Sequence, residues 1–168
     1  MKTSTLLMVF ATLIFIGCSK SENYIPPVDN DELSAMLSFD GATPVLYSFK
    51  GDEVFFHRAV SYNGVKEIFF GCAKNNMQLH FELTDVTRRG TFLFGYPQVP
   101  ESAYCLYSEG NYLIDSNHYS TAFREASGFI KIDSLSTTYM SGSFHVKCVQ
   151  PPDYKILEIS AGSFKGYF

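Results

Sequence analysis

The chain has 168 residues, of which 46% are hydrophobic, 16% aromatic and 18% charged. This length suits one domain, and a high aromatic content with modest charge is unlike the composition of disordered chains. Thirteen basic residues against seventeen acidic ones give a net charge of −4, which provides no long-range attraction for phosphate backbones and argues against a nucleic-acid partner.

The first segment has the composition of a targeting signal. Lys2 supplies a positive charge, and an uncharged, mostly apolar run follows from Leu6 to Ile16. A helix of this length reaches about 16 Å, roughly half the thickness of a ~30 Å hydrocarbon core. The sequence therefore predicts a signal peptide over residues 1–17, and the alternative of a retained anchor helix is the weaker interpretation.

The end of the apolar run resembles a bacterial lipobox. In Phe15-Ile16-Gly17-Cys18, two apolar residues and a small residue precede a cysteine, although leucine is preferred where Phe15 stands. Lipidation requires the thiol for a thioether, and signal peptidase requires the small residue. We predict cleavage between Gly17 and Cys18 and acylation of Cys18 by chains such as palmitate, of which more than one gives a stable anchor. The alternative is an ordinary secretory signal with a chance cysteine.

Residues 18–31 are expected to form a flexible tether, because Pro26-Pro27 follow a polar stretch and resist both helix and strand. Ser19, rather than aspartate, follows Cys18, which by analogy with lipoprotein sorting favours the outer membrane. Surface-export signals in Bacteroidota lipoproteins are richer in acids than this stretch, where Glu22 is the one acid before Pro26. The periplasmic and surface-facing sides therefore both stay open.

Residues 32–168 are predicted to form a single all-β domain, because the strongest period there is two. Apolar residues alternate with polar ones over Leu33–Phe39 and Met77–Thr84, as in strands with one wet face. Many short strands separated by turn signals, including Pro151-Pro152-Asp153, predict an antiparallel β-sandwich or partly closed barrel of about 8–10 strands. Further strands are expected at Pro44–Phe49, Val54–Val60, Val65–Cys72, Thr91–Phe94, Ala103–Leu106, Tyr112–Ile114, Phe129–Ile132, Phe144–Cys148 and Ile156–Ala161.

Glycine stands shortly before an aromatic residue in four places. Their uneven spacing excludes a repeat array, and none lies in a phosphate-binding context, so no cofactor is predicted. We expect these glycines to start strands or to allow close approach of two backbones. The four segments are Arg89-Gly90-Thr91-Phe92, Ser127-Gly128-Phe129-Ile130, Ser141-Gly142-Ser143-Phe144 and Ala161-Gly162-Ser163-Phe164.

Taken in order, with Tyr119-Ser120-Thr121 between the first two and Ile159-Ser160 before the last, these motifs resemble a family of small Bacteroidota lipoproteins known only as a domain of unknown function. The resemblance covers roughly residues 33–168. It implies an all-β envelope lipoprotein and carries over no catalytic residue. The Pro151-Pro152 loop and the three cysteines other than Cys18 depart from the family pattern.

Cys72, Cys105 and Cys148 remain once the lipidated cysteine is set aside. An oxidising envelope permits a disulfide, but three thiols allow at most one pair. Cys72 and Cys148 each share a strand face with apolar residues, which suits free core thiols. Free thiols and one disulfide both stay open, whereas a nucleophilic thiol would need a lowered pKa.

The four histidines show no metal-binding spacing, and no metal site is predicted. His80 and Glu82 lie two apart on one expected strand face and are weak candidate ligands, and the favoured interpretation is two polar residues on a solvated face. The sequence contains no G-x-S-x-G motif, which would indicate a hydrolase. Its acidic residues form no recognisable motif for a catalytic carboxylate pair. Tyr104, Tyr107, Tyr112 and Tyr119 suit either sugar stacking or core packing.

Three functions follow from these observations. The favoured one is a non-catalytic binding or assembly module at the outer membrane, with another envelope protein or a glycan as partner. The second is a carrier of a small apolar ligand in a barrel lumen, and the third is a hydrolase. A filled core with an exposed aromatic patch would favour the first, an apolar cavity the second, and converging acids or histidines the third.

Overall fold

The computed structural model describes residues 30–95, 100–110 and 118–168. In this part of the chain the fold is all-β, with eleven strands in one nearly closed, antiparallel, barrel-like sheet, which confirms the predicted class. The predicted signal peptide, Cys18, the tether up to residue 29 and the strand Tyr112–Ile114 lie outside the described residues. The elements are β1 (Glu32–Phe39), β2 (Val45–Lys50), η1 (Gly51–Glu53), β3 (Val54–Val60), β4 (Lys66–Lys74), β5 (Met77–Thr84), β6 (Gly90–Leu93), β7 (Ser102–Glu109), β8 (His118–Ser120), β9 (Ser127–Leu135), β10 (Tyr139–Gln150) and β11 (Lys155–Tyr167).

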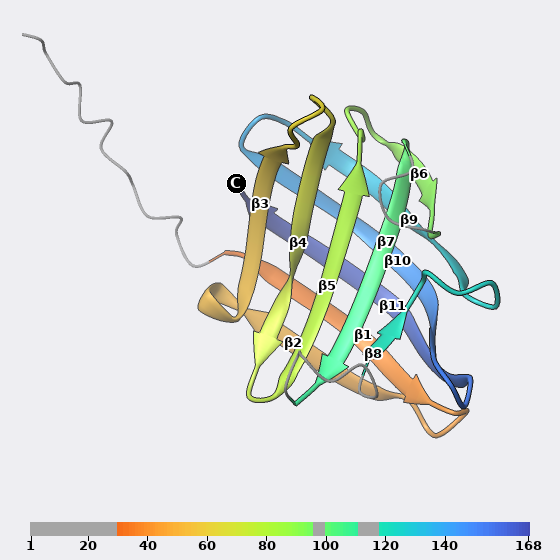
Figure 1. Ribbon diagram of the computed structural model, residues 1–168. Coiled ribbons are helices and arrows are strands. Elements are labelled where there is room, and N and C mark those ends of the chain that lie inside the picture. The colour runs from red at the N-terminus through yellow and green to blue at the C-terminus, as the bar shows by residue number, and fades with distance from the viewer. Residues whose placement is uncertain (1–29, 96–99, 111–117) are drawn as a thin grey trace, which may run out of the picture.

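The barrel is flattened into two layers that cross at an angle (Figure 1). One layer, here called the front sheet, contains β3, β4, β5, β7 and β8 as neighbours in that order. The other, the back sheet, runs β2–β1–β11–β10, with β9 paired to β10 and β6 paired to β9. Each layer therefore has an inner side that faces the core and an outer side that faces solvent.

The two layers join at one corner through short elements. β8 pairs with β7 and meets β10 at one residue pair, Ser120 and Val149. At the other end of this corner, a parallel bridge between Phe94 and Ala103 links the end of β6 to β7. The front sheet is thus joined to the back sheet twice over short lengths, once from β7 through β8 to β10 and once from β7 to the end of β6, which lets the wall turn sharply.

The C-terminal residue lies against β3 and helps to close another part of the barrel. The Phe168 ring packs edge-on against Phe56, and the Arg58 guanidinium lies 4.1 Å above its centre. The Arg58 side chain also donates a hydrogen bond to the carbonyl of Ser136. These contacts join the edge strand β3 to the end of β11 and the β9–β10 turn.

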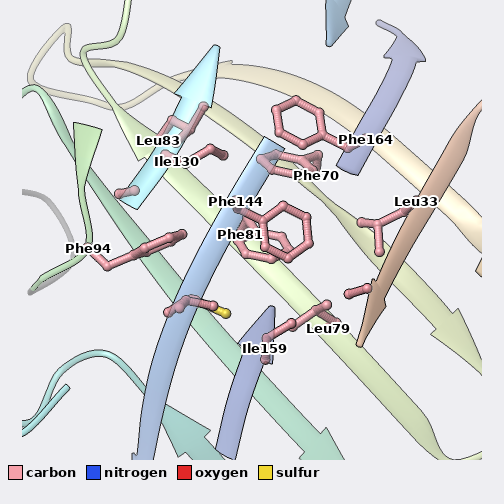
Figure 2. Packing of buried hydrophobic residues seen from close by; sticks show 14 of the residues in the cluster. Leu33, Phe70, Leu79, Phe81, Leu83, Phe94, Ile130, Phe144, Ile159 and Phe164 are labelled. Carbon is pink, nitrogen blue, oxygen red and sulfur yellow. The ribbon is translucent and has the colours of Figure 1, made fainter. Parts of the chain in front are cut away.

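The interior is filled by phenylalanine rings from both layers. Phe70 and Phe81 of the front sheet lie 4.7 Å apart by ring centroids, Phe70 lies 4.5 Å from Phe164, and Phe81 lies 4.6 Å from Phe144 (Figure 2). All four are at most 3% exposed. Stacks of this kind add attraction beyond the apolar area they bury, so these rings tie the front sheet to the back sheet.

β11 is longer than the sequence indicated. The strand was expected to end at Ala161, and Gly162 was expected either to start a strand or to allow close approach, but the strand continues to Tyr167. Ala161 adopts a left-handed conformation with φ of 46°, and the register with β1 and β10 shifts there, as in a β-bulge. Gly162 then packs against the Phe144 ring, which a Cβ would overlap. The glycine serves close packing inside a strand rather than a turn.

Candidate functional site

The outer side of the front sheet carries a group of aromatic and apolar side chains. Strand alternation turns Phe55 and Phe69 outward, because their neighbours Val54, Ile68 and Phe70 point into the core. The register places His80 opposite Gly71 and Leu106, and Glu82 opposite Phe69 and Tyr104. We call the following residues the outer aromatic patch: Phe55, Phe69, His80, Tyr104 and Leu106.

A glycine at the centre of this patch lets Phe55 lie across the sheet. Gly71 pairs with Phe55 on one side and with His80 on the other. A Cβ at Gly71 would be 2.9 Å from the tip of the Phe55 ring and would overlap the carbonyl oxygen of Leu79. The Phe55 ring therefore covers β4 where there is no side chain, and reaches His80 two strands away, with centroids 5.9 Å apart and planes 30° apart.

His80 is held between two phenylalanines. Its ring lies 5.7 Å from that of Phe69 as well as 5.9 Å from that of Phe55. This enclosure removes water from the imidazole, and the burial lowers the pKa of His80 below its ordinary value. At neutral pH the His80 ring is therefore uncharged and behaves as a third aromatic surface in the patch.

The charges around the patch are few and negative. The outward positions of the described front-sheet strands β3, β4, β5, β7 and β8 hold two glutamates and neither lysine nor arginine. Glu82 accepts a hydrogen bond from the Thr84 hydroxyl at 3.3 Å. The outward residues are Phe55, His57, Ala59, Glu67, Phe69, Gly71, Ala73, Gln78, His80, Glu82, Thr84, Ser102, Tyr104, Leu106, Ser108, His118 and Ser120.

The outer side of the back sheet has a different chemistry. A row of serines, Ser48, Ser34, Ser163 and Ser143, crosses four adjacent strands, and the Ser34 and Ser163 hydroxyls are 2.9 Å apart. In the next row, Glu32 lies between two lysines of neighbouring strands, 3.6 Å from Lys50 and 3.2 Å from Lys165. A shallow hollow of about 480 Å³ covers this polar surface.

The sequence-predicted ligands His80 and Glu82 do share one outer face, as the alternation indicated. Within the described ranges, no three residues among His, Cys, Asp and Glu gather closely enough to hold a metal ion. The partners of His80 are instead the two phenylalanine rings, which the sequence analysis missed as part of a site. The positions of Phe55 and Phe69 beside His80 depend on the pairing of β3, β4 and β5. The sequence predicted each of them only as a strand residue.

The three cysteines are free thiols buried in the interior. Burial raises the pKa of Cys72 to about 12 and raises that of Cys105 well above its ordinary value, where a hydrogen bond with Cys148 adds to the effect. A thiol that stays protonated at neutral pH is a poor nucleophile. This arrangement matches the core-thiol alternative of the sequence analysis.

The tyrosines divide between the two environments that the sequence left open. Tyr107 is buried, with its ring 5.6 Å from Phe39 and 6.0 Å from Tyr119, and its hydroxyl donates a hydrogen bond to Glu109. Burial, assisted by Glu109, raises the Tyr107 pKa. Tyr104 lies half-buried on the outer face, and Tyr112 lies outside the described residues.

No protein-family model, curated protein or solved structure matches the chain. No helix in the described ranges is long and apolar enough to span a membrane.

Proposed function

We propose that the protein is an outer-membrane lipoprotein whose barrel is a non-catalytic binding or assembly module, with the outer aromatic patch as its contact surface. The observation that carries this proposal is the patch itself: aromatic side chains held together on the solvent side of a sheet whose inner side already packs the core. Contiguous apolar surface of this kind is typical of interaction sites. Acylation at Cys18 would keep the domain at the membrane.

The packed interior favours this function over that of a carrier. A ligand in the barrel interior would have to occupy the space that Phe70, Phe81 and Phe144 fill. The ring centroids there are 4.6–4.7 Å apart, so the rings are in contact and leave no room between them. Catalysis by a cysteine nucleophile also finds little support, because Cys72 and Cys105 are buried and burial raises the pKa of each thiol. The resemblance to small Bacteroidota lipoproteins is consistent with an envelope module.

Site-specific crosslinking in intact membranes tests the contact surface. A benzophenone side chain introduced in place of Leu106, on β7 within the patch, should form an adduct with the partner. The matched control is the same group in place of Leu93, which is 70% exposed on β6 of the back sheet. Adducts at position 106, with either a polypeptide or a glycan, and none at 93 are expected, and equal labelling at the two positions would overturn the proposal.

The anchor has its own test. The Cys18→Ser variant should accumulate as an unprocessed precursor, because neither the thioether nor the subsequent cleavage can occur without the thiol. Metabolic labelling with radioactive palmitate and membrane fractionation would measure this. A variant that is still cleaved and still sediments with the membrane would show that Cys18 is not the anchor.

A further inference from the structure

We infer that the outer aromatic patch binds a neutral saccharide, with sugar rings lying on Phe55 and Phe69 and sugar hydroxyls bonded to the polar residues beside them. This inference rests on the proposed function and narrows its partner to one chemical class. It depends on the size of the patch, its charge and its functional groups.

The size of the patch fits a small ligand better than a protein. A stable protein–protein interface uses about 20–30 residues on each side. The outer aromatic patch has five, and the outward positions around it hold small residues such as Ala59, Ala73 and Ser102. Such a surface lacks the large side chains that anchor the rest of a protein interface.

The charge of the face disfavours acidic ligands and the membrane itself. A surface that binds phosphates, anionic lipids or acidic polysaccharides uses lysine and arginine. The outward positions of β3, β4, β5, β7 and β8 hold neither, and they hold Glu67 and Glu82. His80 adds no positive charge at neutral pH, since burial lowers its pKa. The partner that remains is apolar in part and uncharged.

The functional groups match a sugar ring. The C–H groups of a pyranose form an apolar, slightly positive surface that suits the negative face of an aromatic ring. Phe55 lies across Gly71 and is 38% exposed, so it offers part of its ring to a ligand. In the adjacent row, Glu82 provides a carboxylate and Tyr104 a hydroxyl, two groups that hydrogen-bond to sugar hydroxyls.

The back sheet provides a matched control. Phe129 is 41% exposed and its ring lies 6.4 Å from that of His145, so it forms a second outward Phe–His pair. Its surroundings are charged, however, because His145 lies 3.5 Å from Glu158 and the neighbouring Lys131 pairs with Asp133. Removing the Phe129 ring therefore shows the effect of losing an exposed aromatic side chain outside the outer aromatic patch.

Affinity electrophoresis of the full chain, extracted in a neutral detergent, is the direct test. Native gels would contain dextran, galactomannan, xyloglucan or xylan as neutral probes, and polygalacturonate as the acidic probe. We expect at least one neutral polysaccharide to retard the protein. Phe55→Ala and Phe69→Ala should bind it roughly tenfold more weakly, equivalent to about 1.4 kcal/mol, whereas Phe129→Ala should bind like the parent protein.

Three outcomes would overturn the inference: no retardation by any neutral probe, retardation by polygalacturonate alone, or equal weakening by Phe129→Ala. Circular dichroism of each variant would show that the fold is retained. Crosslinking at position 106 distinguishes a failure of the saccharide inference from a failure of the proposed binding function. A polypeptide adduct there would leave the binding module standing and exclude the saccharide, whereas no adduct together with no retardation would remove both.

Discussion

The two outer faces of the barrel are built on the same strand alternation but carry opposite chemistry. On the back sheet, outward positions hold serines and ion pairs such as Glu32 with Lys50 and Lys165, which remain well hydrated. On the front sheet they hold Phe55, Phe69 and His80, which cluster ring to ring. The inner packing requires apolar residues only on the inward side, so it explains neither the aromatic cluster of the front face nor the scattered exposed Leu46, Leu93 and Phe129 of the back face. An aromatic surface that the core does not need points to a role in binding.

Exposure alone does not separate the two faces. Phe55 and Phe129 are 38% and 41% exposed, and each lies beside a histidine. They differ in their neighbours, since Phe55 belongs to a group on three adjacent strands and Phe129 lies among charged pairs. The density of rings, and the lack of lysine and arginine at the outward positions of the described strands β3, β4, β5, β7 and β8, define the front face rather than any single exposed residue.

The largest expected effect comes from the inner layer, which both faces share. Phe81→Ala should destabilise the fold by about 3–5 kcal/mol, because the ring is fully buried between Phe70 and Phe144. Phe129→Ala, on the outer side of the back sheet, should cost about 1 kcal/mol or less. Urea unfolding of both variants measures the difference. Similar losses of unfolding free energy in the two variants would mean that the phenylalanine rings between the layers do not stabilise the core.

The second prediction tests the surface on which Phe55 lies. Gly71→Ala should destabilise the protein by about 1–3 kcal/mol, because the new Cβ overlaps the Leu79 carbonyl and meets the Phe55 ring. Ser143→Ala, at one end of the serine row, should change stability by no more than about 0.5 kcal/mol. Thermal unfolding compares the two variants, and a neutral Gly71→Ala would contradict the close approach of β4 and β5.

The third prediction concerns alkaline pH. The pKa of Cys72 is raised from an ordinary 9.0 to about 12, so between these values the unfolded chain loses its thiol proton while the folded chain keeps it. The contribution of Cys72 to stability should be constant below pH 9 and then fall as pH rises toward 12, by at most about 1.4 kcal/mol per pH unit. Cys72→Ala should make the urea midpoint less sensitive to pH in this range. An unchanged profile would place the Cys72 thiol in contact with solvent.

The smallest expected effect belongs to His80. Burial lowers its pKa, so the folded state prefers the neutral ring, and its contribution to stability is lost as pH falls through the ordinary value of 6.5. NMR titration should show the His80 ring resonances shifting at a lower pH than those of a histidine in a denatured chain. The Phe55→Ala and Phe69→Ala variants should move that midpoint back toward the ordinary value. A midpoint at or above 6.5 in the parent protein would contradict the enclosure of the ring.

Local alternation was enough to predict most of the strands. β1, β3 and β5 lie where Leu33–Phe39, Val54–Val60 and Met77–Thr84 were expected. The alternation of polar and apolar residues is uninterrupted in β5 and is broken only by Met36 in β1. β8 was not predicted, since three residues are too few to show a period. The end of β11 was misplaced because Gly162, a typical turn residue, lies instead against the Phe144 ring, a contact between strands that no local pattern reveals.

The candidate site was predictable only in part. Alternation placed His80 and Glu82 on one wet face, and the structure confirms this. It could not show that Phe55 and Phe69 reach the same imidazole, because Phe55 is brought there by the register of two strand pairs. The choice between sandwich and barrel was open for the same reason: it depends on which distant strands pair.

The pairing of β1 with β11 also sets the order in which the chain can fold. Leu33 lies opposite Phe164, more than 130 residues later, so the first strand of the barrel has no partner on that side until the last strand has been made. Chains dominated by such distant pairings fold slowly, because a long loop must close before the contact stabilises anything.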